Sequence, residues 1–157
     1  LQEFLTPNDR NQEMAAKPIP DGFHTVTPYL VVQEVDKVID FVKRAFAAKE
    51  RFRHLRPDGK TGHAEVTIGN SIIMLGEAPE PSKTMPGMLY LYVSDADATY
   101  KQAVAAGGKS IMEPTTMFYG DRSGAVADPC GNQWWIATHV EDVTPDEVNR
   151  RAQAQGR

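Results

Sequence analysis

The sequence repeats one order of secondary structure twice, and this repeat is its strongest constraint on the fold. A strand, a helix, a hairpin and two further strands are predicted over residues 25–76, and the same order recurs over residues 88–138, offset by about sixty positions. The dipeptide Gly69-Asn70 of the first half matches Gly131-Asn132 of the second. The repeat predicts an α+β fold of two βαβββ modules that form a cup-shaped mixed sheet.

Local patterns place the elements of the first half. Residues 25–32 are rich in β-branched and aromatic types, which predicts a strand. Apolar residues then recur at intervals of three and four over residues 35–47, as in an amphipathic helix. Pro57-Asp58-Gly59 predicts a hairpin turn between strands at residues 50–55 and 63–68, and a further strand follows at residues 71–75.

The second half is interpreted in the same way. Strands are predicted at residues 89–93, 109–112, 124–127 and 133–138, with a helix over residues 95–106 and a loop over residues 113–122. The segment Thr144-Pro145-Asp146-Glu147 matches a helix N-terminal capping box, which predicts a terminal helix through Arg151.

These elements predict five segments. Residues 1–16 are expected to be a disordered or non-native leader, with Met14 as the natural start. The first module is predicted at residues 17–78, a proline-rich linker at 79–87, the second module at 88–140, and a C-terminal helix and tail at 141–157.

Composition limits the partners. The formal net charge is −4, whereas proteins that bind nucleic acid or anionic membranes usually carry a clustered excess of Lys and Arg. There is one cysteine, Cys130, and no apolar run of membrane-spanning length. We therefore expect a cytoplasmic protein that binds neither nucleic acid nor membranes.

Strand alternation identifies a first pair of candidate catalytic residues. Ala64, Val66 and Ile68 should pack beneath the helix, so His63 and Glu65 should point into the cup, about 7 Å apart on one face. A histidine and a carboxylate can act as acid and base or supply two metal ligands. The alternative is a polar strand face that is solvated or bonded to Arg51 or Arg53.

Aromatic residues form a second set of candidates. Trp134 and Trp135 lie on opposite faces of one strand, so Trp134 is expected in the core and Trp135 in the cup. Flat rings and flexible methionines suit a planar organic ligand. The predicted ligand-binding residues are Thr27, Met88, Tyr90, Tyr92, Phe118, Tyr119 and Trp135. The alternative is that these rings fill the core or a dimer interface.

Other reactive residue types receive no functional role. His24, His54 and His139 lie at the ends of elements and are expected to be ordinary surface or turn histidines. Cys130 lacks a cationic neighbour in sequence that would activate its thiol. Gly107-Gly108 follows a helix rather than a strand, so it is expected to cap that helix and not to bind a phosphate.

Several motifs resemble the vicinal-oxygen-chelate superfamily, which includes glyoxalase I, extradiol dioxygenases and bleomycin-binding resistance proteins. They are residues 17–32, Gly62-His-Ala-Glu65, Tyr119-Gly-Asp-Arg122, Asp128-Pro-Cys-Gly131 and residues 136–142. The resemblance is closest to the PhnB-like branch and covers residues 17–151. The chain departs from the usual Asp-Pro-Phe-Gly-His turn of that branch at Cys130 and Asn132.

The resemblance also implies where a metal would bind. Metal-dependent members use a His or Glu near four strand positions that correspond here to Thr27, Ile73 or Met74, Met88 and Trp135. None of these is a normal ligand for a hard divalent ion. We therefore expect no metal and no cofactor.

The expected protein is a homodimer that binds a small aromatic or drug-like molecule, as in resistance by sequestration. The alternative is a metal-dependent lyase, transferase or dioxygenase that uses His63 and Glu65, in a rearranged or dimer-shared site. A third possibility is a domain that only supports a partner protein. Such a domain would have a filled cup with no cavity.

Overall fold

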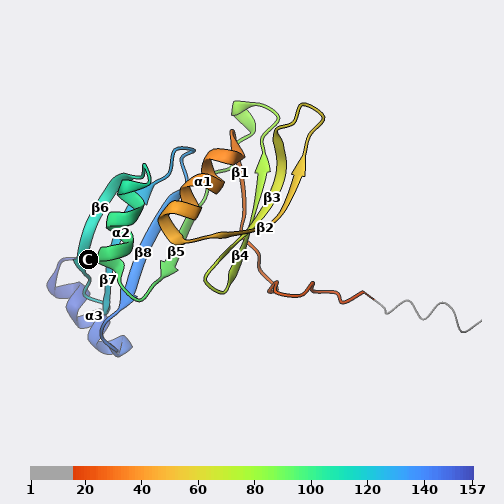
Figure 1. Cartoon of the computed structure of the whole chain (residues 1–157). Helices are drawn as coiled ribbons and strands as arrows, with labels where there is room; N and C mark the ends of the chain where they lie inside the picture. Colours follow the sequence, from red (N-terminus) through yellow and green to blue (C-terminus); the bar gives the residue numbers. More distant parts are fainter. Residues whose placement is uncertain (1–15) are drawn as a thin grey trace, which may run out of the picture.

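A computed structural model describes residues 16–157, which form two four-stranded mixed sheets and three α-helices (Figure 1). Of the predicted leader, only Ala16 is among these residues, and Met14 lies outside them. The elements of the first half are β1 (Tyr29–Val32), α1 (Val35–Phe46), β2 (Lys49–Leu55), β3 (Thr61–Ile68) and β4 (Ser71–Glu77). Those of the second half are β5 (Met88–Tyr92), α2 (Ala96–Ala105), β6 (Lys109–Thr116), β7 (Asp121–Ala127), β8 (Gln133–His139) and α3 (Pro145–Ala154).

The two sheets have the same topology. Sheet 1 has the order β1-β4-β3-β2 and sheet 2 the order β5-β8-β7-β6. β1 pairs parallel with β4, and β5 pairs parallel with β8; the other pairs are antiparallel. The predicted α+β fold of two βαβββ modules is therefore confirmed.

Some element boundaries were predicted wrongly. Residues 113–116 belong to β6 and residues 121 and 122 to β7, where a loop over residues 113–122 was predicted. Pro114 of this segment has no backbone N–H to donate. β6 is the outer strand of sheet 2, however, and an edge strand tolerates proline where no partner needs the N–H. β1 begins only at Tyr29, four residues later than predicted.

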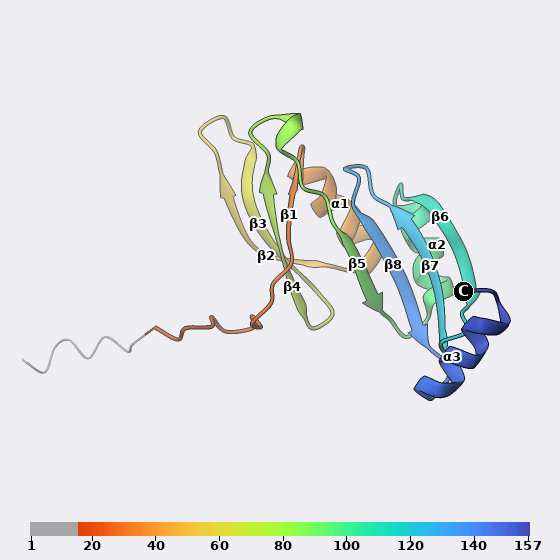
Figure 2. The ribbon, with the colours of Figure 1, turned by 180° about the vertical axis from the view of Figure 1, so that it is seen from behind.

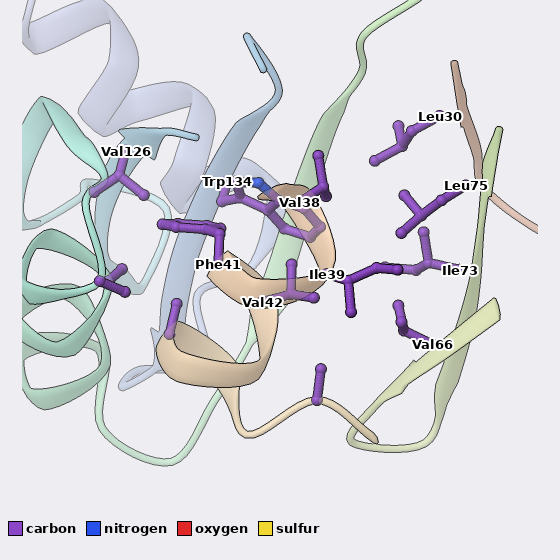
Figure 3. Close-up of a cluster of buried hydrophobic side chains, with 14 of the residues drawn as sticks. Leu30, Val38, Ile39, Phe41, Val42, Val66, Ile73, Leu75, Val126 and Trp134 are labelled. Carbon is purple, nitrogen blue, oxygen red and sulfur yellow. The ribbon is translucent and has the colours of Figure 1, made fainter. Parts of the chain in front are cut away.

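The main helices α1 and α2 lie on the same side of both sheets, which stand side by side with β1 next to β5 (Figure 2). We call the sheet faces toward these helices the inner faces and the opposite ones the outer faces. Figure 3 shows α1 between the inner faces, with Leu30, Ile73 and Leu75 on one side and Val126 and Trp134 on the other. One continuous apolar core therefore joins the two halves.

The strand that ends each half, β4 in the first and β8 in the second, caps the helix of the same half. The Glu77 carboxylate, at the end of β4, accepts hydrogen bonds from the backbone N–H groups of Glu34 and Val35, at 2.9 and 3.0 Å. In the second half the Thr138 hydroxyl of β8 accepts from the N–H of Ala96 at 2.8 Å. Each cap satisfies donors that a helix start leaves without an intrahelical partner.

The turn before β8 is organised by one buried carboxylate, that of Asp128. Its Oδ1 accepts from the backbone N–H groups of Cys130 and Asn132, at 2.8 and 3.0 Å. Its Oδ2 accepts from the Asn132 side-chain amide at 2.8 Å and from the Trp134 indole at 3.0 Å. The fully buried Trp134 then packs against Phe46 of α1, with ring centroids 5.2 Å apart. Asp128 thus fixes both the turn and the central core side chain.

Replacing Asp128 by Ala should lower the free energy of unfolding by about 3 kcal/mol or more, because several buried donors lose their acceptor. Chemical denaturation monitored by tryptophan fluorescence measures this change. The control is Asp146→Ala, since the Asp146 side chain is exposed and forms no hydrogen bond within residues 16–157. The control should change the free energy by about 0.5 kcal/mol or less. Equal losses for both variants would contradict the role given to Asp128.

Candidate ligand-binding site

A cavity of about 1090 Å³ lies between β1 and β5, the two strands that form the facing edges of the sheets. At one end these edges are joined, because Val31 of β1 and Met85 exchange backbone hydrogen bonds of 3.2 and 2.7 Å. Beyond Met85 the chain stops pairing with β1: Gly87 donates its N–H to Asn132 Oδ1 and accepts from the N–H of Gln133. The strands therefore diverge, and the cavity occupies the space between them.

The lining of this cavity combines aromatic and aliphatic side chains with uncharged polar groups. None of its lining residues is Asp, Glu, Lys, Arg or His. The aromatic and thioether side chains are Tyr29, Phe46, Met88, Tyr90 and Tyr92, and the polar ones are Asn70, Ser71, Ser94, Thr99 and Gln102. Such a surface suits an uncharged organic molecule, because a charge without a counter-charge is costly to remove from water.

Two of the lining tyrosines are oriented by one buried carboxylate, Asp121 at the start of β7. The hydroxyls of Tyr90 and Tyr92 both donate to Asp121 Oδ2, at 3.1 and 3.0 Å. Their rings meet with centroids 5.4 Å apart. Burial raises the pKa of Tyr90, and hydrogen bonding to Tyr119 and Asp121 raises it further. Both phenols therefore remain protonated and donate to Asp121, which leaves their oxygens free to accept from a ligand.

The same carboxylate binds His139, which was expected to be an ordinary surface or turn histidine. His139 Nδ1 lies 2.9 Å from Asp121 Oδ1, and Nε2 lies 2.7 Å from Asp142 Oδ1. These hydrogen bonds, first that to Asp121, raise the pKa of His139. Burial alone would raise the pKa of Asp121, but hydrogen bonds from His139, Tyr92 and Tyr90 outweigh it and the pKa is lowered. His139 is an exposed histidine at the end of β8, as expected, and strand pairing and the following loop bring its two carboxylate partners to it.

On the outer face of sheet 1 a tyrosine links the cavity to His63. The Tyr29 hydroxyl lies 3.1 Å from His63 Nδ1. A Cβ atom at Gly76 would lie 2.7 Å from that hydroxyl, so glycine is required for the ring to cross β4. His63 Nε2 lies 3.9 Å from Glu65 Oε1, which is too long for a hydrogen bond. His63 and Glu65 do share the outer face as predicted, but they do not line the cavity.

The arginine partners considered from the sequence bind elsewhere. Arg53 donates to Glu50 and Asp36, and Arg51 lies over the Phe23 ring at 5.2 Å. Neither is bonded to His63 or Glu65 within residues 16–157. His63 is therefore bonded to Tyr29 and not to an arginine.

The predicted ligand-binding residues fall into three groups. Met88, Tyr90 and Tyr92 line the large cavity. Thr27 lies instead at a smaller cavity of about 220 Å³, beside Gly22–Val26 and Ile72. Trp135, Phe118 and Tyr119 line neither cavity. Trp135 is on the outer face as expected, opposite the core residue Trp134.

Sequence reasoning missed Asp121 and Tyr29. Asp121 stands in the Tyr119-Gly-Asp-Arg122 motif, but it was assigned to a loop. Tyr29 follows a proline in a segment interpreted simply as a strand. The repeat could have identified Tyr29, because Tyr29 occupies in sheet 1 the position of Tyr90 in sheet 2. Tyr29 pairs with Met74, and Tyr90 pairs with Trp135.

The positions of the metal ligands in metal-dependent relatives do not carry ligands here. Of the two alternatives Ile73 and Met74, Ile73 is buried in the core, so Met74 is the one on the outer face. The other three positions are Thr27, Met88 and Trp135. Within residues 16–157, no three His, Cys, Asp or Glu side chains are grouped so that they could hold a metal ion. One hydroxyl with two thioethers and an indole does not fit a hard divalent ion, which takes several oxygen ligands.

Two repeated βαβββ modules with a cavity between the first strands of their sheets define the class of protein. The chain belongs to the Glyoxalase/Bleomycin resistance protein/Dioxygenase superfamily, whose profile matches residues 22–136. It is 34% identical over 142 residues to the uncharacterized protein Rv0887c of Mycobacterium tuberculosis, a match that covers 83% of this chain and 84% of that protein.

Solved structures share the fold. TioX from Micromonospora sp. ML1 superimposes with a TM-score of 0.64 at 23% identity, covering 73% of this chain and 98% of that one. A PhnB protein from Bacillus cereus, described as a putative 3-demethylubiquinone-9 3-methyltransferase, gives a TM-score of 0.61 at 16% identity, covering 73% and 99%. At these identities the likeness concerns the fold alone.

The pairing of His139 predicts a pH dependence of stability. Because its folded-state pKa is raised, its contribution is complete below its ordinary pKa of about 6.5 and is lost as pH rises through the folded-state pKa. His139→Asn should therefore flatten the decline of the thermal midpoint between about pH 6 and pH 9. Thermal denaturation across this range, with His54→Asn as the control, measures the effect. Parallel curves for His139→Asn and wild type would contradict it.

Proposed function

We propose that this protein binds a small, uncharged aromatic or drug-like molecule in the cavity between β1 and β5. The observation that supports this most directly is the size and lining of the cavity, about 1090 Å³ with three tyrosines and no charged side chain. That volume is slightly above the usual range of small-molecule sites. Tyr90 and Tyr92 supply ring faces for stacking, and Asp121 keeps their hydroxyls in place.

Binding of this kind serves sequestration, in which the protein removes a harmful compound from solution without changing it. This role needs a cavity of suitable shape but no acid, base or metal in contact with the ligand. The lining fits this requirement, since its only ionisable side chains are tyrosines, and Tyr90 and Tyr92 are held protonated on Asp121. Sequestration is therefore the form of the function that we propose.

Ring stacking at Tyr90 gives a direct test. Tyr90→Ala should weaken binding of a planar uncharged aromatic compound, selected from a panel by calorimetry, by roughly tenfold. Tyr90→Phe is the matched control, because it also loses the Asp121 hydrogen bond but keeps the ring; its affinity should stay within about threefold of wild type. If no compound of the panel binds, or if both variants weaken binding equally, the proposal fails.

The protein is further proposed to act without a metal, as a homodimer in the cytoplasm. Thr27, Met74, Met88 and Trp135 together offer a single hydroxyl oxygen, which is too few ligands to hold a divalent ion. The dimer is supported by large apolar side chains that are exposed and do not line the cavity, namely Phe52, Leu55 and Met85. No helix within residues 16–157 has the length and apolar character needed to span a membrane.

Native mass spectrometry of dialysed protein tests the metal and the dimer together. The expected species is two chains with no bound metal after incubation with Ni, Zn, Mn or Fe salts. A stoichiometric ion that survives dialysis would support the alternative, a metal-dependent enzyme that uses His63 and Glu65. In that case the double variant His63→Ala, Glu65→Ala would lose the ion. A single chain at all protein concentrations would overturn the dimer.

A further inference from the structure

The cavity is bordered by backbone groups that have no backbone partner within residues 16–157. In a parallel pair, alternate residues of a strand turn both backbone groups toward the neighbour. Gly87 accepts from the N–H of Gln133, and Val93 donates to the carbonyl of Ala137, so residues 87, 89, 91 and 93 face β8. Met88, Tyr90 and Tyr92 therefore turn their N–H and C=O groups away from β8, toward the cavity.

β1, on the opposite side of the cavity, also turns backbone groups away from its sheet, over a shorter length. Pro28 accepts from the N–H of Met74, and Val32 accepts from the N–H of Ala78, so residues 28, 30 and 32 face β4. The backbone N–H and C=O groups of Tyr29 and Val31 point away from β4. Val31 uses its groups with Met85, which leaves those of Tyr29 without a backbone partner within residues 16–157.

These groups specify the chemistry of a ligand. Successive facing residues of a strand are about 6.6 Å apart, which matches the repeat of another extended chain but not that of a small fused ring. A sheet edge of this kind pairs readily with an added strand. The absence of charged lining residues disfavours charged side chains, and the tyrosine oxygens held on Asp121 offer further acceptors for amide N–H groups.

We propose that the cavity takes a short, uncharged peptide or peptide-like molecule in an extended conformation, paired through its amides with the free edge of β5. This inference rests on the proposed function and names the ligand class for the same site. The free edge runs only from Met88 to Tyr92, the Val31–Met85 pair closes one end, and Phe46 and Gln102 from the helices also line the cavity. A short molecule fits this space better than a strand of a folded partner.

The first experiment compares two probes on the unaltered protein. Acetyl-Val-Phe-Val-amide should bind and slow hydrogen exchange of the Met88, Tyr90 and Tyr92 amides, measured by NMR on ¹⁵N-labelled protein. Its fully N-methylated analogue has the same side chains but no internal donor N–H, and it should bind at least tenfold more weakly. Equal binding of the two probes would overturn the proposal. So would equal binding of acetyl-Val-Lys-Val-amide, because the site would then accept a charge.

The second experiment removes one donor from the protein. Met88→Pro deletes an N–H that faces the cavity and is not used by β8, and proline is tolerated at such edge positions. Met88→Ala is the control, since it shortens the same side chain but keeps the N–H. Met88→Pro should weaken binding of the blocked tripeptide roughly five- to tenfold relative to Met88→Ala. The same affinity for both variants, with Met88→Pro folded by circular dichroism, would contradict pairing at this edge.

Two further outcomes separate this inference from the proposed function. If planar aromatic compounds bind but the tripeptide neither binds nor protects the β5 amides, the ligand class is wrong and the proposed function stands. If neither binds, both are wrong. Protection of the Met88, Tyr90 and Tyr92 amides that grows with protein concentration, without peptide, would show that a second copy pairs with β5 and would overturn the inference.

Discussion

The buried Asp128 carboxylate is the interaction on which the rest of the second half depends. It accepts four hydrogen bonds, two from the backbone of its own turn and two from the side chains of Asn132 and Trp134. Asn132 is thereby oriented to accept from Gly87, the residue at which the chain enters sheet 2. One carboxylate therefore positions the central tryptophan of the core and the start of β5. The large number of satisfied donors explains how a charged group is tolerated where little water reaches.

The cavity follows from that arrangement. The chain pairs with β1 at Met85 and with β8 from Gly87 onward, so it changes partner within two residues. Pro86 lies at this change, and it has no N–H that either neighbour would have to satisfy. Since β5 is committed to β8, it cannot also extend sheet 1. The space between the sheets is thus a result of how the linker is anchored.

The fold could be predicted from the sequence because its signals are local and occur twice. Alternation in residues 63–68 and the helical period in residues 35–47 each depend on near neighbours, and the repeat tests one half against the other. The site was less predictable because it depends on strand order. Trp135 was expected at its centre, yet β8 is the second strand of its sheet and the cavity runs along the first. Asp121, remote in sequence from Tyr90, reaches it only through the pairing of β7, β8 and β5.

The two helix caps have a consequence for how each half is made. Glu77 lies 42 residues after Val35, and Thr138 lies 42 residues after Ala96. The backbone N–H groups of Val35 and Ala96 can acquire these acceptors only after the last strand of the same half has been synthesised and has paired beside the first. Completion of this cap therefore depends on sheet closure in each half, across the same length of intervening chain. The caps can thus form within one half, whereas the packing of α1 against Val126 and Trp134 must wait for the second half.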